Sequence, residues 1–207
     1  MHGYARREAD MTGRLVLASK SASRQAMLTA AGVPFSALPA DIDERALEAG
    51  MAGAGPAQVC VELATAKALA VSEEEREALV LGSDSLVEVE GKRFDKPGSR
   101  EEAAEHLRFF SGREMRLHSA ATIARTGEVV WADAAMASLH VADLTDDFIA
   151  AYLDKEWPAV AGCVGVFRIE GRGVRLFERI DGDYFTVLGM PLLKVLGALR
   201  ELGELAP

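Results

Sequence analysis

The chain has 207 residues, of which 49% are hydrophobic, and these values predict a globular protein with a real core. Its formal net charge of −9 argues against broad non-specific binding to nucleic acid or to an anionic membrane, although a few local cations and a metal ion can still bind a nucleotide. No apolar stretch approaches the roughly 20 residues of a membrane helix, and the widely separated Cys60 and Cys163 fit a reduced, cytoplasmic setting.

Patterns of apolar and polar residues predict helices and strands in alternation along one domain. Residues 1–12 carry several charges and no apolar run, so they are expected to form a disordered extension before a domain over residues 13–207. In chain order, the first half predicts a strand over 15–18, a helix from Arg24 that Gly32 closes, a strand over 35–38, an acidic loop over 41–44, a flexible segment over 49–56 and a helix over about 57–72.

The second half continues the mixture of helices and strands. It predicts a strand over 79–83 with a hairpin through 86–92, a helix over 99–110, long strands over 115–124 and 129–141, a helix over 145–152, a hairpin of strands over 164–169 and 174–177, and a final helix that begins at 190–191. The fold class is therefore α/β. The glycine-rich connectors are expected to divide the domain into two lobes with a cleft between them.

A first group of polar residues follows the first predicted strand. Ser19, Ser21, Ser23 and Arg24 lie at a helix N-terminus, where exposed N–H groups and the helix dipole favour an anion. The hydroxyls and the guanidinium add donors suited to phosphate. The glycine spacing of a P-loop is absent. An ordinary serine N-cap with a solvated arginine explains this segment, taken alone, at least as well.

A second group begins where the strand over 79–83 is expected to end. Asp84 follows an apolar run, and a carboxylate there is unfavourable unless a metal ion, a hydrogen bond or a cation meets it. Asp84 is therefore expected to hold Mg²⁺ or to polarise an attacking water, although a turn capped by its carboxylate is the alternative. Lys96 precedes Pro97, which biases its backbone toward an extended conformation that directs the ammonium at phosphate charge.

Other charged residues are more ambiguous. Glu44 lies among other acids and is a candidate second metal ligand, but a solvated acidic loop is the stronger interpretation from the sequence alone. Lys67 lies on a helix among small apolar neighbours, where a lysine usually extends outward to solvent. His118 and His140 lie within strand patterns without ligand-like spacing and are interpreted as structural.

These pieces, in this order, closely resemble the Maf family of nucleotide pyrophosphatases over about residues 14–200. No single motif is specific, but the ordered set is strong. The matching residues are Ser19, Ser21 and Arg24 of the family's S-x-S-P-R-R motif, Asp43-Glu44, Lys67-Ala68, Gly82-Ser83-Asp84, Lys96-Pro97, Ser111-Gly112, Ala151-Tyr152, Gly182-Asp183 and Gly189-Met190-Pro191.

The resemblance implies an elongated α/β body with a mixed sheet, flanking helices and a deep cleft between two lobes, similar to inosine-triphosphate pyrophosphatases. Members are often dimeric. They hydrolyse a nucleoside triphosphate to the monophosphate and pyrophosphate with Mg²⁺ or Mn²⁺, which would clear non-standard nucleotides. The implied roles make Asp84 the proton acceptor, with Lys67 and Lys96 as further catalytic residues, and place Glu44 with Asp84 at the metal. Ser19, Ser21, Ser23, Arg24 and Ser85 are then expected to bind substrate.

The chain also departs from the family pattern. Ala22 and Ser23 replace the proline and the first arginine of the opening motif, and Ser85 follows Asp84 where many relatives carry Thr or Gln. Glu170-Gly171 stands where dTTP/UTP-hydrolysing members have glutamine and glycine, and its surroundings look more like the 7-methyl-GTP branch.

The exchange to Glu170 has a physical interpretation. A carboxylate only accepts hydrogen bonds, which suits the N1–H and N2–H donors of guanine, and 7-methylation makes that base cationic. We therefore expect Glu170 to read a guanine-like base. The alternative is an ion pair with Arg168 or Arg172 on a strand surface. Rival functions are a dTTP/UTP pyrophosphatase, a phosphatase that releases inorganic phosphate, and a non-catalytic regulator that binds a nucleotide or a division protein.

Overall fold

The computed structural model describes residues 14–206 and contains a seven-stranded mixed sheet. The strand order is β2-β1-β3-β5-β6-β7, with β4 also paired to β3. β1 is parallel to β2 and β3, and all other neighbours are antiparallel. The strands are β1 (Arg14–Leu17), β2 (Ser36–Ala37), β3 (Ala78–Val89), β4 (Lys92–Phe94), β5 (Glu114–Arg125), β6 (Glu128–Val141) and β7 (Phe177–Asp181). The predicted extension over residues 1–12 lies outside the described residues.

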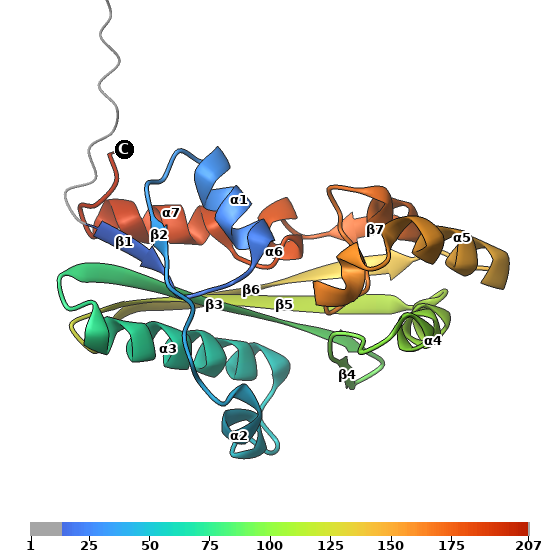
Figure 1. Cartoon of the computed structure of the whole chain (residues 1–207), viewed down its shortest axis with the longest axis horizontal. Coiled ribbons are helices and arrows are strands. Elements are labelled where there is room, and N and C mark those ends of the chain that lie inside the picture. Colours follow the sequence, from blue (N-terminus) through green and yellow to red (C-terminus); the bar gives the residue numbers. More distant parts are fainter. Residues whose placement is uncertain (1–13, 207) are drawn as a thin grey trace, which may run out of the picture.

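Helices cover both faces of this sheet. The long helix α3 packs on one face, whereas α1, α6 and α7 lie on the other (Figure 1). The helices are α1 (Ala22–Ala30), α2 (Glu44–Ala49), α3 (Pro56–Glu74), α4 (Arg100–Phe110), α5 (Asp146–Glu156), α6 (Tyr184–Val187) and α7 (Leu192–Glu201), with 3-10 turns η1 (Ala159–Gly162) and η2 (Arg172–Leu176). The α/β class with an elongated mixed sheet and flanking helices is confirmed. None of the helices in residues 14–206 is both long and apolar enough to cross a membrane.

Local signals explain many of these boundaries. The side chains of Ser99 and Thr145 accept hydrogen bonds from backbone N–H groups at the start of α4 and α5, as an N-cap does. Thr126 and Gly127 both have positive φ, which suits a two-residue hairpin between β5 and β6 whose turn twist matches that of the strands.

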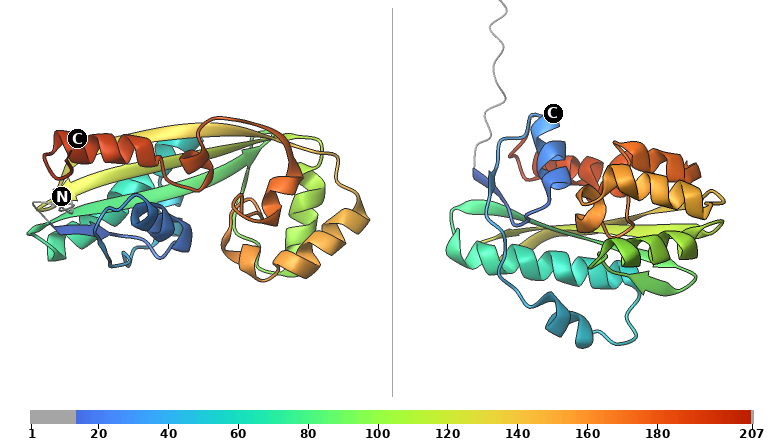
Figure 2. Two further views of the ribbon diagram at one scale, coloured as in Figure 1. Left: turned by 90° about the horizontal axis from the view of Figure 1, so that it is seen from above. Right: turned by 45° about the vertical axis from the view of Figure 1, so that its right-hand side comes forward.

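The buried core has separate parts at the two ends of the long strands. One cluster joins Phe110 of α4 and Ile149 of α5 to the outer ends of β3, β5 and β6. Another joins Leu17 of β1 to Met27 of α1 and Val195 of α7. Figure 2 shows the corresponding two groups of helices, linked by the extended strands of the sheet.

The structure corrects three predicted segments. The strand expected over 79–83 and the apolar run at 86–89 form the single strand β3, so Asp84 lies within a strand and not at its end. The acidic loop over 41–44 ends in α2, whose first turn contains Glu44.

The third correction concerns the hairpin predicted over 164–177. The segment over 164–169 forms turns, η2 follows, and β7 begins only at Phe177. Val166 is fully buried with a positive φ of 58°, and its carbonyl accepts a hydrogen bond from the Tyr152 hydroxyl. Phe167 packs edge-on against Phe177, with ring centroids 4.8 Å apart. The apolar run is therefore buried as a compact turn, which an alternation pattern does not distinguish from a strand.

Candidate active site

The candidate site lies at a gap along one edge of β3. β1 pairs with β3 only as far as Leu81, and β4 pairs with β3 only from Val87 onward. Between these points, residues 82–86 have no strand neighbour on that side among the described residues, while β5 pairs with them on the other side. Asp84 is in the middle of this gap. The strand that ends at this gap is β1, so the prediction that the strand over 79–83 ends at Asp84 is wrong.

Side chains of β3 alternate between the two faces of the sheet at this gap. Asp84 points toward α3, where it meets Lys67. Ser83 and Ser85 point to the other face, where both contact the backbone carbonyl of Gly189. The site thus has an acidic side beneath α3 and a hydroxyl-rich side beneath α1 and α6.

A buried ion pair forms the acidic side. The Nζ atom of Lys67 lies 2.6 Å from Oδ1 of Asp84 and 3.0 Å from Oε1 of Glu44. Lys67 is 9% exposed and Asp84 is 7% exposed, whereas the side chain of Glu44 is 48% exposed. The lysine does not extend outward to solvent because two carboxylates meet it. A buried carboxylate needs such a partner, since an unpaired charge in the interior is strongly unfavourable.

Gly82 sets the separation between α3 and β3 here. A Cβ atom at this position would lie 2.1 Å from the carbonyl oxygen of Ala64 and 2.8 Å from the backbone nitrogen of Ala68. The absence of a side chain lets the helix approach the strand closely. Lys67 lies in the same turn of α3 as these two alanines, so this close approach brings its ammonium to Asp84.

Arg24 dominates the other side. Its Nε donates to the carbonyl oxygen of Gly189 at 2.9 Å, Nη1 donates to Oγ of Ser19 at 3.1 Å, and Nη2 donates to Oγ of Ser85 at 2.9 Å. Part of the side chain remains exposed, but the charged group lies deep enough for burial to lower the pKa of Arg24. The negative charges of Asp84 and Glu44 oppose that shift in the pKa of Arg24.

The serines before and within α1 hold its N-terminus. Ser21 is the N-cap and accepts a hydrogen bond from the backbone nitrogen of Arg24 at 3.4 Å. Oγ of Ser19 accepts from the backbone nitrogen of Ser21 at 3.2 Å. Oγ of Ser23 donates to the carbonyl of Leu188 at 2.9 Å. The capping alternative and the anion-binding interpretation are therefore compatible, because the cap places Arg24 beside the gap.

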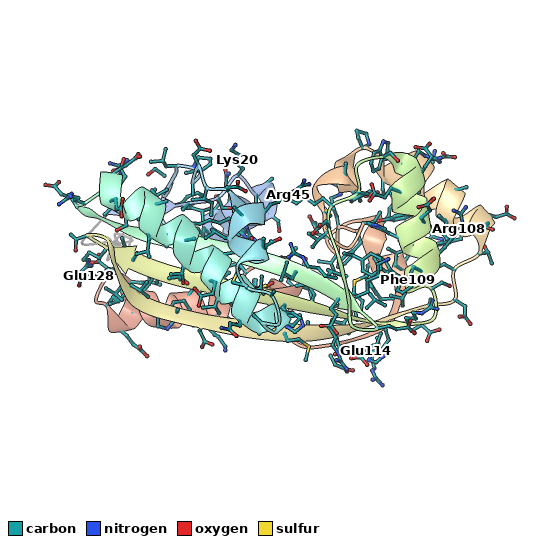
Figure 3. All side chains as sticks on the ribbon, turned by 90° about the horizontal axis from the view of Figure 1, so that it is seen from below. Lys20, Arg45, Arg108, Phe109, Glu114 and Glu128 are labelled. Atoms are coloured by element: carbon teal, nitrogen blue, oxygen red, sulfur yellow. The ribbon has the colours of Figure 1, made fainter. Side chains whose placement is uncertain are left out.

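Lys96 and Glu170 do not join the Asp84 cluster. Both are exposed, and no hydrogen bond or ion pair of either forms within residues 14–206. Both charges act on Cys163: burial raises the pKa of that thiol, Glu170 raises it further and Lys96 lowers it. Figure 3 shows Lys20 and Arg45 in the half of the molecule that contains α3, and Arg108 and Phe109 in the other half.

The alternative for Glu170 was a surface ion pair with Arg168 or Arg172. Glu170 forms no such pair among the described residues. Arg168 pairs instead with the buried Glu156, at 2.8 Å, and Arg172 lies 3.9 Å from the same carboxylate. Glu170 therefore remains an exposed acceptor. Its predicted contact with a base stays a prediction.

Several contributors to the site were not predicted as site residues. The carbonyl of Gly189 is the main one, although the glycine belongs to the quoted closing motif. Ser83 and Ser119 are fully buried and extend the hydrogen-bond network, with Ser119 donating to the carbonyl of Thr186 at 2.9 Å. A serine inside a long strand pattern carries no distinguishing signal in the sequence.

The donor set is compatible with a divalent metal. Among the described residues, no group of three or more histidine, cysteine, aspartate or glutamate side chains is arranged to hold a metal ion. Asp84 and Glu44, however, both direct an oxygen at the same cation, the ammonium of Lys67. Mg²⁺ is usually bound by one or two carboxylates together with substrate phosphates, so these two residues fit its requirements.

Comparisons with known proteins extend over nearly the whole chain. Residues 14–202 match the family model described as Maf-like protein. The chain is 47% identical to the 7-methyl-GTP pyrophosphatase of Rhizobium etli, over 94% of this chain and 99% of the relative. It is 47% identical to the protein of that name from Rhizobium meliloti, over 92% and 97%. It is 44% identical to the nucleoside triphosphate pyrophosphatase of Rhodopseudomonas palustris strain HaA2, over 94% and 96%.

A solved structure gives a more distant similarity. A HAM1 protein from Coxiella burnetii matches with a TM-score of 0.43 and 17% identity, over 64% of this chain and 75% of that chain. The family model and the sequence relatives, by contrast, cover more than nine-tenths of the chain or of the residues described. The chain belongs to the Maf family.

Proposed function

We propose that this protein hydrolyses a nucleoside triphosphate to the monophosphate and pyrophosphate, and that 7-methyl-GTP is a preferred substrate. The observation that carries the proposal is the buried carboxylate of Asp84, held 2.6 Å from Lys67 in the gap of β3 and faced by Arg24 from the other side. Relatives 47% identical to this chain bear the name 7-methyl-GTP pyrophosphatase, which supports the choice of substrate.

Each site residue has a distinct role in the proposed reaction. Asp84 accepts a proton from a water molecule whose oxygen attacks the α-phosphorus. The bond from the α-phosphorus to the bridging oxygen then breaks, and pyrophosphate leaves with the electron pair. Lys67 compensates the buried charge of Asp84 and, with Arg24 and Lys96, offsets the negative charge of the triphosphate. Such preorganised charges favour the transition state because their positions are fixed before the reaction begins.

A divalent cation completes the proposal. Asp84 and Glu44 would hold Mg²⁺ or Mn²⁺, which would neutralise charge on the phosphate oxygens. Ser19 and Ser21, at the N-terminus of α1, present groups that favour a phosphate. The cytoplasmic setting and the homodimer that the family resemblance implies stay predictions.

Glu170 is proposed as the residue that reads the base. It is exposed and free of an ion pair among the described residues, so its oxygens can accept the N1–H and N2–H of guanine. The positive charge of 7-methylguanine adds an attraction that uracil and thymine lack. Glu170→Gln should therefore reduce the preference for 7-methyl-GTP over dTTP.

A nucleotide panel tests the proposal. The purified protein is incubated with Mg²⁺ and 7-methyl-GTP, GTP, dTTP, UTP, CTP or ITP. Pyrophosphate release is measured, and inorganic phosphate is assayed with and without an added inorganic pyrophosphatase. Asp84→Asn should abolish turnover. Asp133→Asn is the matched control and should retain turnover, because it removes only a surface ion pair between Asp133 on β6 and Lys194 on α7.

The outcomes separate the rival functions. Selective turnover of 7-methyl-GTP supports both the activity and the role of Glu170. Faster turnover of dTTP or UTP keeps the activity and removes the guanine assignment. Direct release of inorganic phosphate indicates a phosphatase. No turnover with Mg²⁺ or Mn²⁺ contradicts the proposed activity and favours a nucleotide-binding regulator.

A further inference from the structure

The turn between α6 and α7 holds the hydroxyl-rich side of the site through two backbone carbonyls. The carbonyl of Leu188 accepts a hydrogen bond from Oγ of Ser23 at 2.9 Å. The carbonyl of Gly189 accepts from Nε of Arg24 at 2.9 Å and from Oγ of Ser85 at 2.9 Å, with Oγ of Ser83 at 3.4 Å. One carbonyl oxygen near the C-terminus of the chain therefore connects α1 with the catalytic strand β3.

We infer that Gly189 and Ser85 are positioning residues, which aim the guanidinium of Arg24 at the triphosphate and do not themselves contact substrate. The inference rests on the proposed function for the identity of the ligand. It reassigns Ser85, which the sequence places among the substrate-binding residues.

The hydrogen bonds of Ser85 support this reassignment. A hydroxyl has one proton to donate, and that of Ser85 is directed to the carbonyl of Gly189. Its oxygen accepts from Nη2 of Arg24 at 2.9 Å, and Oγ of Ser119 lies 3.3 Å away. Ser85 also points to the opposite face of the sheet from Asp84. The donor and acceptor of the Ser85 hydroxyl are thus both engaged by neighbouring protein groups.

Arg24 has donors left for a ligand. A guanidinium carries five N–H groups, and the described residues engage Nε, one N–H of Nη1 and one N–H of Nη2. One N–H therefore remains on each terminal nitrogen. A guanidinium with N–H groups left in this way can donate to phosphate oxygens. Its direction is fixed by the three acceptors, Gly189, Ser19 and Ser85.

The backbone at Gly189 explains why a glycine stands there. Its φ of +100° lies in a region that other residues rarely adopt, and a Cβ atom would lie 3.0 Å from Oγ of Ser85 and 3.9 Å from Nη2 of Arg24. A side chain at this position would crowd the Ser85 hydroxyl, which also accepts from Arg24, whereas its contact with Arg24 itself would be an ordinary one.

A double-mutant cycle distinguishes positioning from direct contact. Ser85→Ala, Arg24→Ala and the double variant are each made in an Asp84→Asn background, so that the nucleotide survives calorimetric titration. The ligands are 7-methyl-GTP and dTTP, which share the triphosphate. Ser85→Ala should weaken the affinity for both on the order of tenfold, because a hydrogen bond that orients a charged group is lost. It should have no further effect once Arg24 is absent, and Ser85→Thr should restore the affinity.

Kinetics in the otherwise native enzyme give a second readout. Ser85→Ala should raise KM more than it lowers kcat. An equal loss from Ser85→Ala with and without Arg24 would overturn the inference, because it would mean that the hydroxyl contacts the nucleotide independently.

A glycine pair supplies the matched control. Gly189→Ala should weaken triphosphate binding, whereas Gly91→Ala, with a φ of +75° and no atom of residues 14–206 within 4 Å of the added Cβ, should only lower stability. Equal affinities in the two variants would contradict the role of Gly189. If the native protein binds the nucleotides without hydrolysing them, the proposed activity is wrong. The positioning role can still be tested, because the double-mutant cycle measures affinities. A protein that binds neither nucleotide overturns both.

Discussion

Gly82→Ala is the most direct test of how the fold builds the acidic side of the site. The added Cβ atom would lie 2.1 Å from the carbonyl oxygen of Ala64 and 2.8 Å from the backbone nitrogen of Ala68. Both are backbone atoms of α3, a helix of 19 residues with a row of buried side chains, so neither can move without shifting the helix. Overpacking a well-packed core usually destabilises by about 1–3 kcal/mol, and this contact is closer than most.

We therefore expect Gly82→Ala to lower the free energy of unfolding by about 3 kcal/mol, the upper end of that range. In a chain of this size, a change of 1 kcal/mol shifts Tm by about 2–4 °C, so the expected fall is about 6–12 °C. The shift of α3 should also separate Lys67 from Asp84, now 2.6 Å apart. Pyrophosphate release per folded molecule should fall as well.

Gly197→Ala is the control for this change. Gly197 lies within α7, and an added Cβ meets no atom within 4 Å. Because alanine is the better helix former, this variant should be more stable than the native protein by up to about 1 kcal/mol. Thermal unfolding and urea titration compare the two variants. A Gly82→Ala protein that melts within about 2 °C of the native protein would refute the argument, because less than about 1 kcal/mol would then be lost.

Local signals in the sequence were sufficient for the long elements. The strands β5 and β6 and the helix α4 are all set by neighbours in the chain, and the sequence predicts each of them close to its observed bounds. The final helix α7 likewise follows its apolar stripe, although it begins at Leu192.

The site required information that no local pattern contains. The polar run from Ser83 to Ser85 looks like the end of a strand, yet β3 continues through it, because β5 pairs with every one of its residues from Leu79 to Val89. The gap beside Asp84 depends on where β1 and β4 stop pairing with β3, which is a property of the sheet register.

Ion pairs between distant segments likewise cannot be predicted from the sequence of one segment. Lys67 lies among small apolar neighbours, and its burial follows only from carboxylates that approach from β3 and α2. The carbonyl of Gly189 reaches Arg24 from 165 residues away in the sequence. Every residue has a backbone carbonyl, so the residue type at position 189 does not predict this hydrogen bond.

Three further predictions concern charged or titratable groups buried away from solvent. Lys67→Met should destabilise by about 3–5 kcal/mol, because it leaves the buried carboxylate of Asp84 without its partner, and Lys67→Met/Asp84→Asn should recover most of that loss in urea titrations. Arg168→Ala should be destabilising for the same reason, since Glu156 is 4% exposed and pairs with Arg168 at 2.8 Å, and restoration of stability by Glu156→Gln in that variant would identify the unpaired charge as the cause. Burial raises the pKa of the Cys60 thiol from 9.0 to about 12, with a further contribution from the charge of Asp84. The unfolded chain therefore loses this proton at a lower pH than the folded protein does, so the contribution of Cys60 to stability is complete below pH 9 and is lost as the pH rises toward 12. Denaturant titrations should show a smaller loss of stability across that window in Cys60→Ala than in the native protein, and equal slopes would mean that the thiol is not held in its neutral form by the fold.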